Sequence, residues 1–173
     1  MKNNIEIMSP VGSYEALNAA INAGANSIYF GVTQLNMRSR SAKNFTLNDL
    51  KKISNICKKN KVKSYLTLNT VMYDHDINLM KKIVDTAKLS GISALIISDI
   101  SAMMYAKKKG IEVHISTQAN VSNFESVKFY SQFADVIVLA RELTLKQVKY
   151  IVDEIKKNKT KGPSGKLVQI ELF

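Results

Sequence analysis

Short apolar segments alternate with longer amphipathic segments along the whole chain. The short segments are rich in Ile, Val, Leu and Tyr and predict strands at residues 5–8, 27–30, 62–68, 94–98, 111–116, 135–140 and 166–173. Between them, apolar positions recur with helical spacing. This spacing predicts helices that open at Ser13, Thr46, Asp76, Ile100, Ser122 and Thr144.

The ends of several predicted helices carry local stop and start signals. Gly91 and Gly110 follow the last apolar positions of their helices, where a left-handed residue commonly ends a helix. A hydroxyl residue followed three positions later by an acid or amide predicts a capping box at Thr46–Asp49, Ser122–Glu125 and Thr144–Gln147.

This alternation is typical of parallel βα units with right-handed crossovers. About seven strands and six helices come close to an eight-fold barrel, which typically needs ~250 residues. We therefore predict an α/β fold in which parallel βα units form an incomplete TIM-like barrel. A doubly wound open sheet is the alternative, but no glycine-rich dinucleotide motif follows the first strand. Because natural proteins avoid open sheet edges, we expect residues 1–173 to be a single domain, the N-terminal part of a longer barrel.

The composition indicates a globular chain with no membrane segment. Of its 173 residues 46% are hydrophobic, which is enough for a core. No apolar run approaches the ~20 residues of a bilayer span, and the start lacks the apolar region of a signal peptide. The single cysteine, Cys57, excludes an internal disulfide and a metal site built from several cysteines of this chain. We expect a cytoplasmic protein.

The chain is strongly basic, with 25 Lys and Arg against 14 Asp and Glu and a net charge of +11. Most of the lysines fall in predicted helices, as at 51–52, 58–59, 107–109 and 156–157, which is typical of a solvated outer face. A basic surface is also what nucleic acid attracts, so nucleic acid is the alternative explanation.

Polar residues follow most of the predicted strands, at the ends where parallel α/β folds bind their ligands. They are Asn36, Arg38 and Arg40, Asn69, Asp99, His114, Ser116, Thr117, Gln118 and Asn120, Arg141 and Glu142, and Glu171. All three arginines of the chain belong to this set. Since a guanidinium offers a planar, bidentate fork, Arg38, Arg40 and Arg141 are predicted to bind a carboxylate or phosphate at one mouth. Chance clustering, or a structural ion pair of Arg141, is the competing explanation.

Strand alternation suggests what lines the interior. With a period of two, His114, Ser116 and Gln118 share one face, and so do Tyr65, Thr67 and Asn69. If these faces point inward, the interior is polar near its mouth and suits a small anionic molecule. The same pattern fits a hydrogen-bonded polar core layer, and His114 is as well explained as a buried core residue as a catalytic one.

Several chemistries have no support. With two histidines and no His–carboxylate cluster, the sequence does not predict a zinc hydrolase or another metal site. No lysine ends a strand and no nucleophile elbow is present, although Ser116 remains a candidate nucleophile. Asp99, Glu142 and Glu171, with His114, are the candidate acids and bases. These residues do not assemble into a complete catalytic mechanism.

Motifs in consistent order resemble one known family. They are the segments 8–16 (MSPVGSYEA), 24–31 (GANSIYFG), 36–45 (NMRSRSAKNF), 68–70 (LNT), 97–99 (ISD), 114–120 (HISTQAN), 139–143 (LAREL) and 171–173 (ELF). Together they resemble the collagenase-like peptidase family U32 over nearly the whole chain, and the last segment resembles the start of its E-x-F-x-H-G-x-x-C signature.

The resemblance implies several activities. Family members are named as peptidases, as factors that hydroxylate a tRNA wobble uridine or ribosomal RNA, and as factors of oxygen-independent ubiquinone hydroxylation. Several carry an iron–sulfur cluster on four cysteines, which in those proteins lie beyond the region matched here. The resemblance thus leaves such a cluster open for the full-length protein and predicts none in this chain.

Charge and resemblance together favour RNA hydroxylation, with tRNA or rRNA as partner and an anionic small molecule in the mouth. Proteolysis is the alternative. A second alternative is a non-catalytic piece that needs the C-terminal remainder of the barrel, and we expect residues 1–173 alone to be inactive.

Overall fold

A computed structural model describes residues 5–37 and 44–173 and places seven parallel strands in one sheet. The strands follow one another in chain order: β1 (Met8–Pro10), β2 (Ser27–Gly31), β3 (Lys63–Leu68), β4 (Ala94–Ile97), β5 (Glu112–Ile115), β6 (Val136–Val138) and β7 (Gln169–Glu171). The described part also contains six α-helices: α1 (Tyr14–Asn22), α2 (Leu50–Lys59), α3 (Ile77–Ser90), α4 (Ile100–Lys109), α5 (Phe124–Tyr130) and α6 (Leu145–Lys157).

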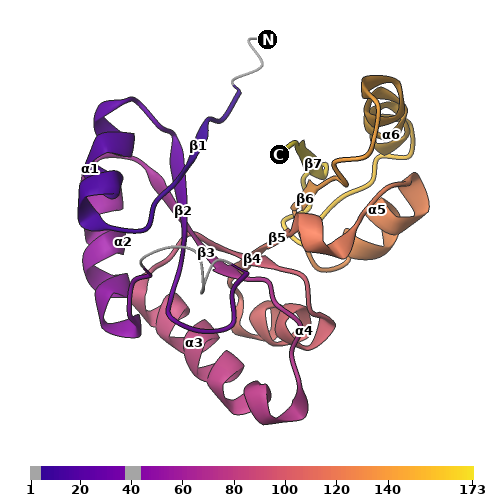
Figure 1. Ribbon diagram of the computed structural model, residues 1–173. Helices are drawn as coiled ribbons and strands as arrows, with labels where there is room; N and C mark the ends of the chain where they lie inside the picture. Colours follow the sequence, from indigo (N-terminus) through magenta and orange to yellow (C-terminus); the bar gives the residue numbers. More distant parts are fainter. Residues whose placement is uncertain (1–4, 38–43) are drawn as a thin grey trace.

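The sheet curls into a half-barrel, with the helices on its outer side and β1 and β7 facing each other across the interior (Figure 1). The predicted incomplete TIM-like barrel is confirmed. A doubly wound sheet would break the sequential strand order and place helices on both faces, so that alternative is wrong. Among the described residues, nothing pairs with the outer edge of β1 or of β7.

Alternation along the strands separates two apolar regions. Side chains such as Ile28, Leu66 and Ile97 point outward and are fully buried beneath the helices. A smaller cluster fills the inner face, where Tyr65 and Ile96 pack with partly buried neighbours. The interior of the half-barrel is therefore packed below its mouth, as in complete barrels.

The strands in the middle of the sheet lie close to their predicted positions, whereas the others differ. β1 begins three residues later than expected because Ile5 and Ile7 extend into solvent, with exposed fractions of 84% and 63%. β7 is confined to Gln169–Glu171 because the preceding residues turn back on themselves. That turn is closed by an antiparallel bridge between Lys161 and Leu167.

Two of the three predicted capping boxes form, at Thr46–Asp49 and at Thr144–Gln147. The box predicted at Ser122 is wrong, because α5 begins one residue later than expected. The extended backbone that precedes α5 belongs to Asn123, whose Oδ1 accepts a 2.9 Å hydrogen bond from the Ser126 backbone N–H. Gly91 and Gly110 end α3 and α4 in the left-handed conformation, as predicted.

Replacing Thr144 with alanine should lower the free energy of unfolding by about 1 kcal/mol, because the backbone N–H of Gln147 loses its hydroxyl acceptor. Thr144→Ser keeps the hydroxyl and should be nearly neutral. Chemical denaturation of the two variants measures the difference, and equal stabilities would contradict this role of the cap.

Among residues 5–37 and 44–173, no helix is long and apolar enough to cross a membrane. Cys57 is buried in α2, and burial raises the pKa of its thiol to about 11. An iron–sulfur cluster needs several thiolates, so this side chain does not fit a cluster site.

Candidate functional site

The polar faces predicted for β3 and β5 do point into the half-barrel. Thr67 and Ser116 are buried on this inner side, whereas their neighbours Leu66 and Ile115 join the helix-covered core. The Thr67 hydroxyl donates a 3.0 Å hydrogen bond to the carbonyl of Phe30 on the neighbouring strand. Period-two alternation therefore identified the inner face correctly.

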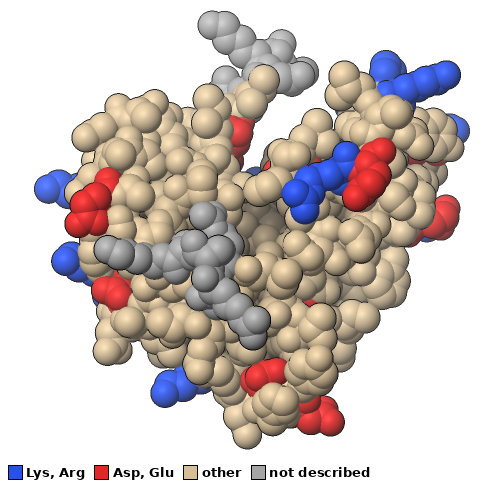
Figure 2. Space-filling view, viewed as in Figure 1, with Lys and Arg blue, Asp and Glu red and all other residues tan. Residues whose placement is uncertain are grey.

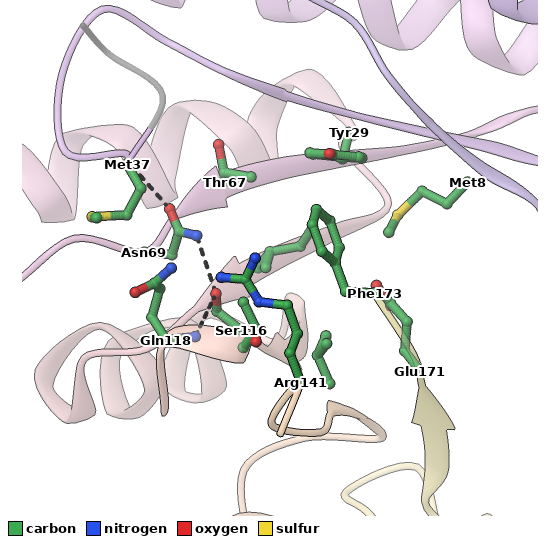
Figure 3. Close-up of a pocket in the computed structure, with 13 residues that line it drawn as sticks. Met8, Tyr29, Met37, Thr67, Asn69, Ser116, Gln118, Arg141, Glu171 and Phe173 are labelled. Atoms are coloured by element: carbon green, nitrogen blue, oxygen red, sulfur yellow. Dashed lines mark hydrogen bonds between the residues drawn. The ribbon is translucent and has the colours of Figure 1, made fainter. Parts of the chain in front are cut away.

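A cavity of about 290 Å³ opens at the carboxyl ends of the strands. Figure 2 shows the face of the molecule hollowed near its centre, with a cationic and an acidic side chain at the rim and the other charged side chains mostly towards the margins. The lining comes from all seven strands or the segments after them: Met8, Tyr29, Met37, Thr67, Asn69, Ile96, Ser116, Thr117, Gln118, Val138, Arg141, Glu171 and Phe173 (Figure 3).

Hydrogen bonds connect the polar side of this cavity across two strands. The Asn69 Nδ2 donates to Ser116 Oγ over 3.1 Å, and its Oδ1 accepts from the Met37 backbone N–H over 3.3 Å. Ser116 Oγ also accepts from the Gln118 backbone N–H, at 3.4 Å. Because both of these bonds use the oxygen as acceptor, the Ser116 hydroxyl proton can be donated to a ligand.

Phe45, which follows the segment 38–43 outside the described residues, packs into the core. The Phe45 ring packs edge-on against Tyr14 and Phe30, with centroid distances of 5.2 and 5.5 Å. Before that segment, the buried Asn36 fills the space beside Gly31, where a Cβ atom would lie 2.5 Å from Asn36 Oδ1. Asn36 therefore packs against the end of β2 and does not line the cavity.

Arg141 is the cation placed at this cavity. Its guanidinium lies 5.8 Å from the centroid of the Phe173 ring, and Figure 3 shows it between that ring and the Asn69–Ser116 pair. Over the described part of the chain, no Asp or Glu carboxylate lies within 4.0 Å of it. Within residues 5–37 and 44–173, therefore, no acid forms the structural ion pair that is the competing explanation of Arg141. A planar cation held by a ring and not neutralised by an acid is suited to bind an anion.

Glu171 lines the same cavity from β7. Burial raises the pKa of this carboxyl; the His114 imidazole opposes that shift, and Glu6 adds to it. The described lining therefore contains one cation, Arg141, and one acid, Glu171, whose ionisation burial disfavours.

His114 lies on the inner face of β5 but below the cavity, which it does not line. Its Nε2 is 3.1 Å from Glu112 Oε1, and its ring centroid is 4.5 Å from that of Tyr65. The hydrogen bond with His114 lowers the pKa of Glu112 against the opposing effect of burial. The Nδ1 of His114 is buried and has no hydrogen-bond partner among the described residues. His114 is therefore a buried interior residue. The two-residue alternation along the strand predicts that it faces inward but not that it lies below the cavity.

A second set of polar contacts lies near the start of β3. The Tyr65 hydroxyl and the Lys63 ammonium each donate a 2.6 Å hydrogen bond to the Glu6 carboxylate. Burial raises the pKa of Glu6, but hydrogen bonding, mainly from Lys63 and Tyr65 and also from Ser27, and the charge of Lys63 lower it, so the net shift is downward. Burial and the Glu6 bond raise the pKa of Tyr65.

The remaining candidates lie outside the cavity lining. Asp99 caps α4, accepting hydrogen bonds from the backbone N–H groups of Ser101 and Ala102, so this carboxylate has a structural role that an N-cap signal could have predicted. Asn120 and Glu142 are exposed and do not line it. Arg38 and Arg40 lie outside the described residues, so the gathering of all three arginines stays a prediction.

Sequence reasoning missed the apolar wall of the cavity. Met8, Tyr29, Met37, Ile96, Val138 and Phe173 form it. Tyr29 lies two positions after Ser27 on β2, so alternation along that strand could have placed its ring inside.

No group of three or more His, Cys, Asp or Glu side chains in the described ranges could hold a metal ion. The partners of Ser116 Oγ are the Asn69 side-chain amide and the Gln118 backbone N–H. The nearby imidazole of His114 is bonded to Glu112 and not to Ser116. The described site therefore provides donors for an anion and no activated nucleophile.

A sequential half-barrel with a polar mouth belongs to the class of TIM-barrel-like proteins, and the comparisons with known proteins identify the family. The chain belongs to peptidase family U32, whose model matches residues 12–173. The solved structure of a U32 peptidase superposes with a TM-score of 0.73 at 14% identity, covering 99% of this chain and 69% of that one. Tryptophan synthase subunit alpha from Legionella pneumophila shares the fold at a TM-score of 0.59 and 15% identity, covering 96% of this chain and 71% of that one.

Relatives in the family carry different names. A collagenase of Porphyromonas gingivalis is 58% identical over 99% of this chain and 41% of its own length. A tRNA hydroxylation protein P of Helicobacter pylori is 34% identical over 83% of this chain and 35% of its own. The 23S rRNA 5-hydroxycytidine C2501 synthase of Escherichia coli is 29% identical over 86% of this chain and 22% of its own. The chain thus spans about two fifths or less of the length of these relatives.

Proposed function

We propose that this chain forms the anion-binding part of the barrel mouth in a U32 protein that hydroxylates tRNA or rRNA. The observation that carries the proposal is the cavity itself, in which Arg141 lacks a carboxylate partner among the described residues and faces the Ser116 hydroxyl. Relatives named for tRNA and rRNA hydroxylation support the activity.

In this proposal the cavity binds an anionic small molecule and not the RNA. A volume of about 290 Å³ suits a small ligand, and its wall combines apolar rings with a few directed donors. Arg141 would bind a carboxylate or phosphate through its fork, and Ser116 would donate its hydroxyl proton. The net charge of +11 would attract RNA from outside the mouth.

Proteolysis is the second candidate because the relative named collagenase is 58% identical to this chain. Against it, the described cavity holds no nucleophile with an adjacent base. Other parts of the full-length protein could supply such groups, so the two functions are separated by experiment.

The test compares cells with and without the gene for the full-length protein. We expect deletion to remove a hydroxylated pyrimidine nucleoside from tRNA or rRNA digests analysed by mass spectrometry, and the intact gene to restore it. Purified full-length protein should leave gelatin and casein uncut. Cleavage of gelatin by clean protein, with no change in any RNA nucleoside, would instead establish the peptidase.

A further inference from the structure

Opposite charges line one cavity without forming an ion pair. Arg141 and Glu171 both contribute to its wall, yet their charged groups are not within 4.0 Å of each other, and the guanidinium lies against the Phe173 ring. A ligand anion placed beside Arg141 would therefore share the cavity with the Glu171 carboxyl. An ionised carboxylate there repels the anion, whereas a protonated one does not and can donate a hydrogen bond.

We propose that the cavity takes up one proton on Glu171 when it binds an anion, so that Glu171 makes the affinity for anionic ligands depend on pH. This inference rests on the anion-binding part of the proposed function. It does not depend on which reaction the full-length protein performs.

The surroundings of Glu171 support this coupling. The carboxyl is partly buried on the inner face of β7, and this burial already raises its pKa before any anion binds. An added negative charge within the cavity raises it further. By linkage, the affinity for an anion is highest where Glu171 is protonated in the free protein. It then falls as pH rises, by up to about tenfold per pH unit for a single proton.

Other titratable and charged groups surround Glu171. Glu6 before β1, Tyr65 on β3 and His114 on β5 interact with its charge, and Tyr29 on β2 and Arg141 after β6 share the cavity lining with it. Lys63 and Glu112 lie one contact further away, bonded to Glu6 and His114 respectively. Of these, His114 is the competing proton acceptor, because its Nδ1 is buried without a partner in the described part of the chain. An experiment must therefore separate proton uptake by Glu171 from proton uptake by His114.

The probe is benzenesulfonate, which stays negatively charged over the range tested and has a ring to match the walls made by Tyr29 and Phe173. Benzenesulfonamide is its neutral counterpart of nearly the same shape. Titration calorimetry of the full-length protein in two buffers of different ionisation enthalpy, from about pH 5 to about pH 8, gives the number of protons bound. We expect uptake approaching one proton with benzenesulfonate and none with benzenesulfonamide.

Three variants assign the proton. Glu171→Gln should bind benzenesulfonate with an affinity that no longer changes with pH and without proton uptake. Glu142→Gln, which alters an exposed acid next to Arg141 and outside the lining, should behave as the wild type. His114→Gln should retain the uptake. The wild-type measurement stands even if a variant fails to fold.

Absence of benzenesulfonate binding, absence of proton uptake, or uptake that persists in Glu171→Gln would each overturn the inference. Loss of uptake in His114→Gln with retention in Glu171→Gln would assign the proton to the imidazole and also overturn it. The RNA nucleoside assay separates the two proposals. Proton-linked binding without any effect on RNA would leave the inference intact and contradict the hydroxylation function, whereas normal hydroxylation without proton uptake would do the reverse.

Discussion

Arg141→Gln is expected to weaken benzenesulfonate binding by the full-length protein about 10- to 100-fold, or about 1.4–2.8 kcal/mol. The substitution removes the charge and the bidentate fork, and no other cation lines the described cavity. Because the side chain is exposed at the mouth, its loss should leave the fold intact. Yield of the hydroxylated nucleoside in complemented cells should fall in parallel.

Two matched variants make this result specific. Arg141→Lys keeps the charge without the planar fork and should give an intermediate affinity. Glu142→Gln changes the adjacent exposed residue and should bind as the wild type does. Unchanged affinity in Arg141→Gln would show that the anion is held elsewhere, and the proposed function would lose the observation on which it depends.

Leu95→Ala should lower the free energy of unfolding by about 2–5 kcal/mol, because it opens a void under the helices in the middle of the sheet. Leu95 is fully buried on β4, between β3 and β5, which carry the Asn69–Ser116 contact. The same substitution at Leu89 on α3, where the side chain is 82% exposed, should change stability by less than about 0.5 kcal/mol. Chemical denaturation of the full-length variants compares the two, and equal losses would mean that the β4 core is not as packed as described.

The sequence predicted the middle of the sheet well because β3 and β4 are runs buried on both faces. Every residue of β3 after Lys63 is buried, and so is every residue of β4. A continuous buried run of this kind can be recognised in the sequence without knowing which strands pair with it. β1, β6 and β7 have three residues each, and their bounds are set by the register in which they pair with a neighbouring strand. Hydrophobic pattern alone does not contain that register.

The sequence predicted which face of the sheet the candidate site residues lie on, but not how far each lies below the mouth of the half-barrel. Alternation placed Ser116 and His114 on the same inner face, yet Ser116 lines the cavity and His114 lies beneath it. Height within a curled sheet depends on strand tilt, which a period of two does not encode. Asp99 was misjudged for a different reason: an acid at the end of a strand is also an acid at the start of a helix, and here the helix cap uses its oxygen.

The ring contact between Tyr29 and Phe173, at 6.3 Å between centroids, joins residues from opposite ends of the curled sheet. The Phe173 ring also packs against the guanidinium of Arg141. Flattening of the sheet would separate the Tyr29 and Phe173 rings and would move the Phe173 ring away from the guanidinium. The curvature of the sheet and the position of the Arg141 guanidinium are therefore coupled through the Phe173 ring. An occupied mouth should slow amide hydrogen exchange in β1 and β7 more than in β4.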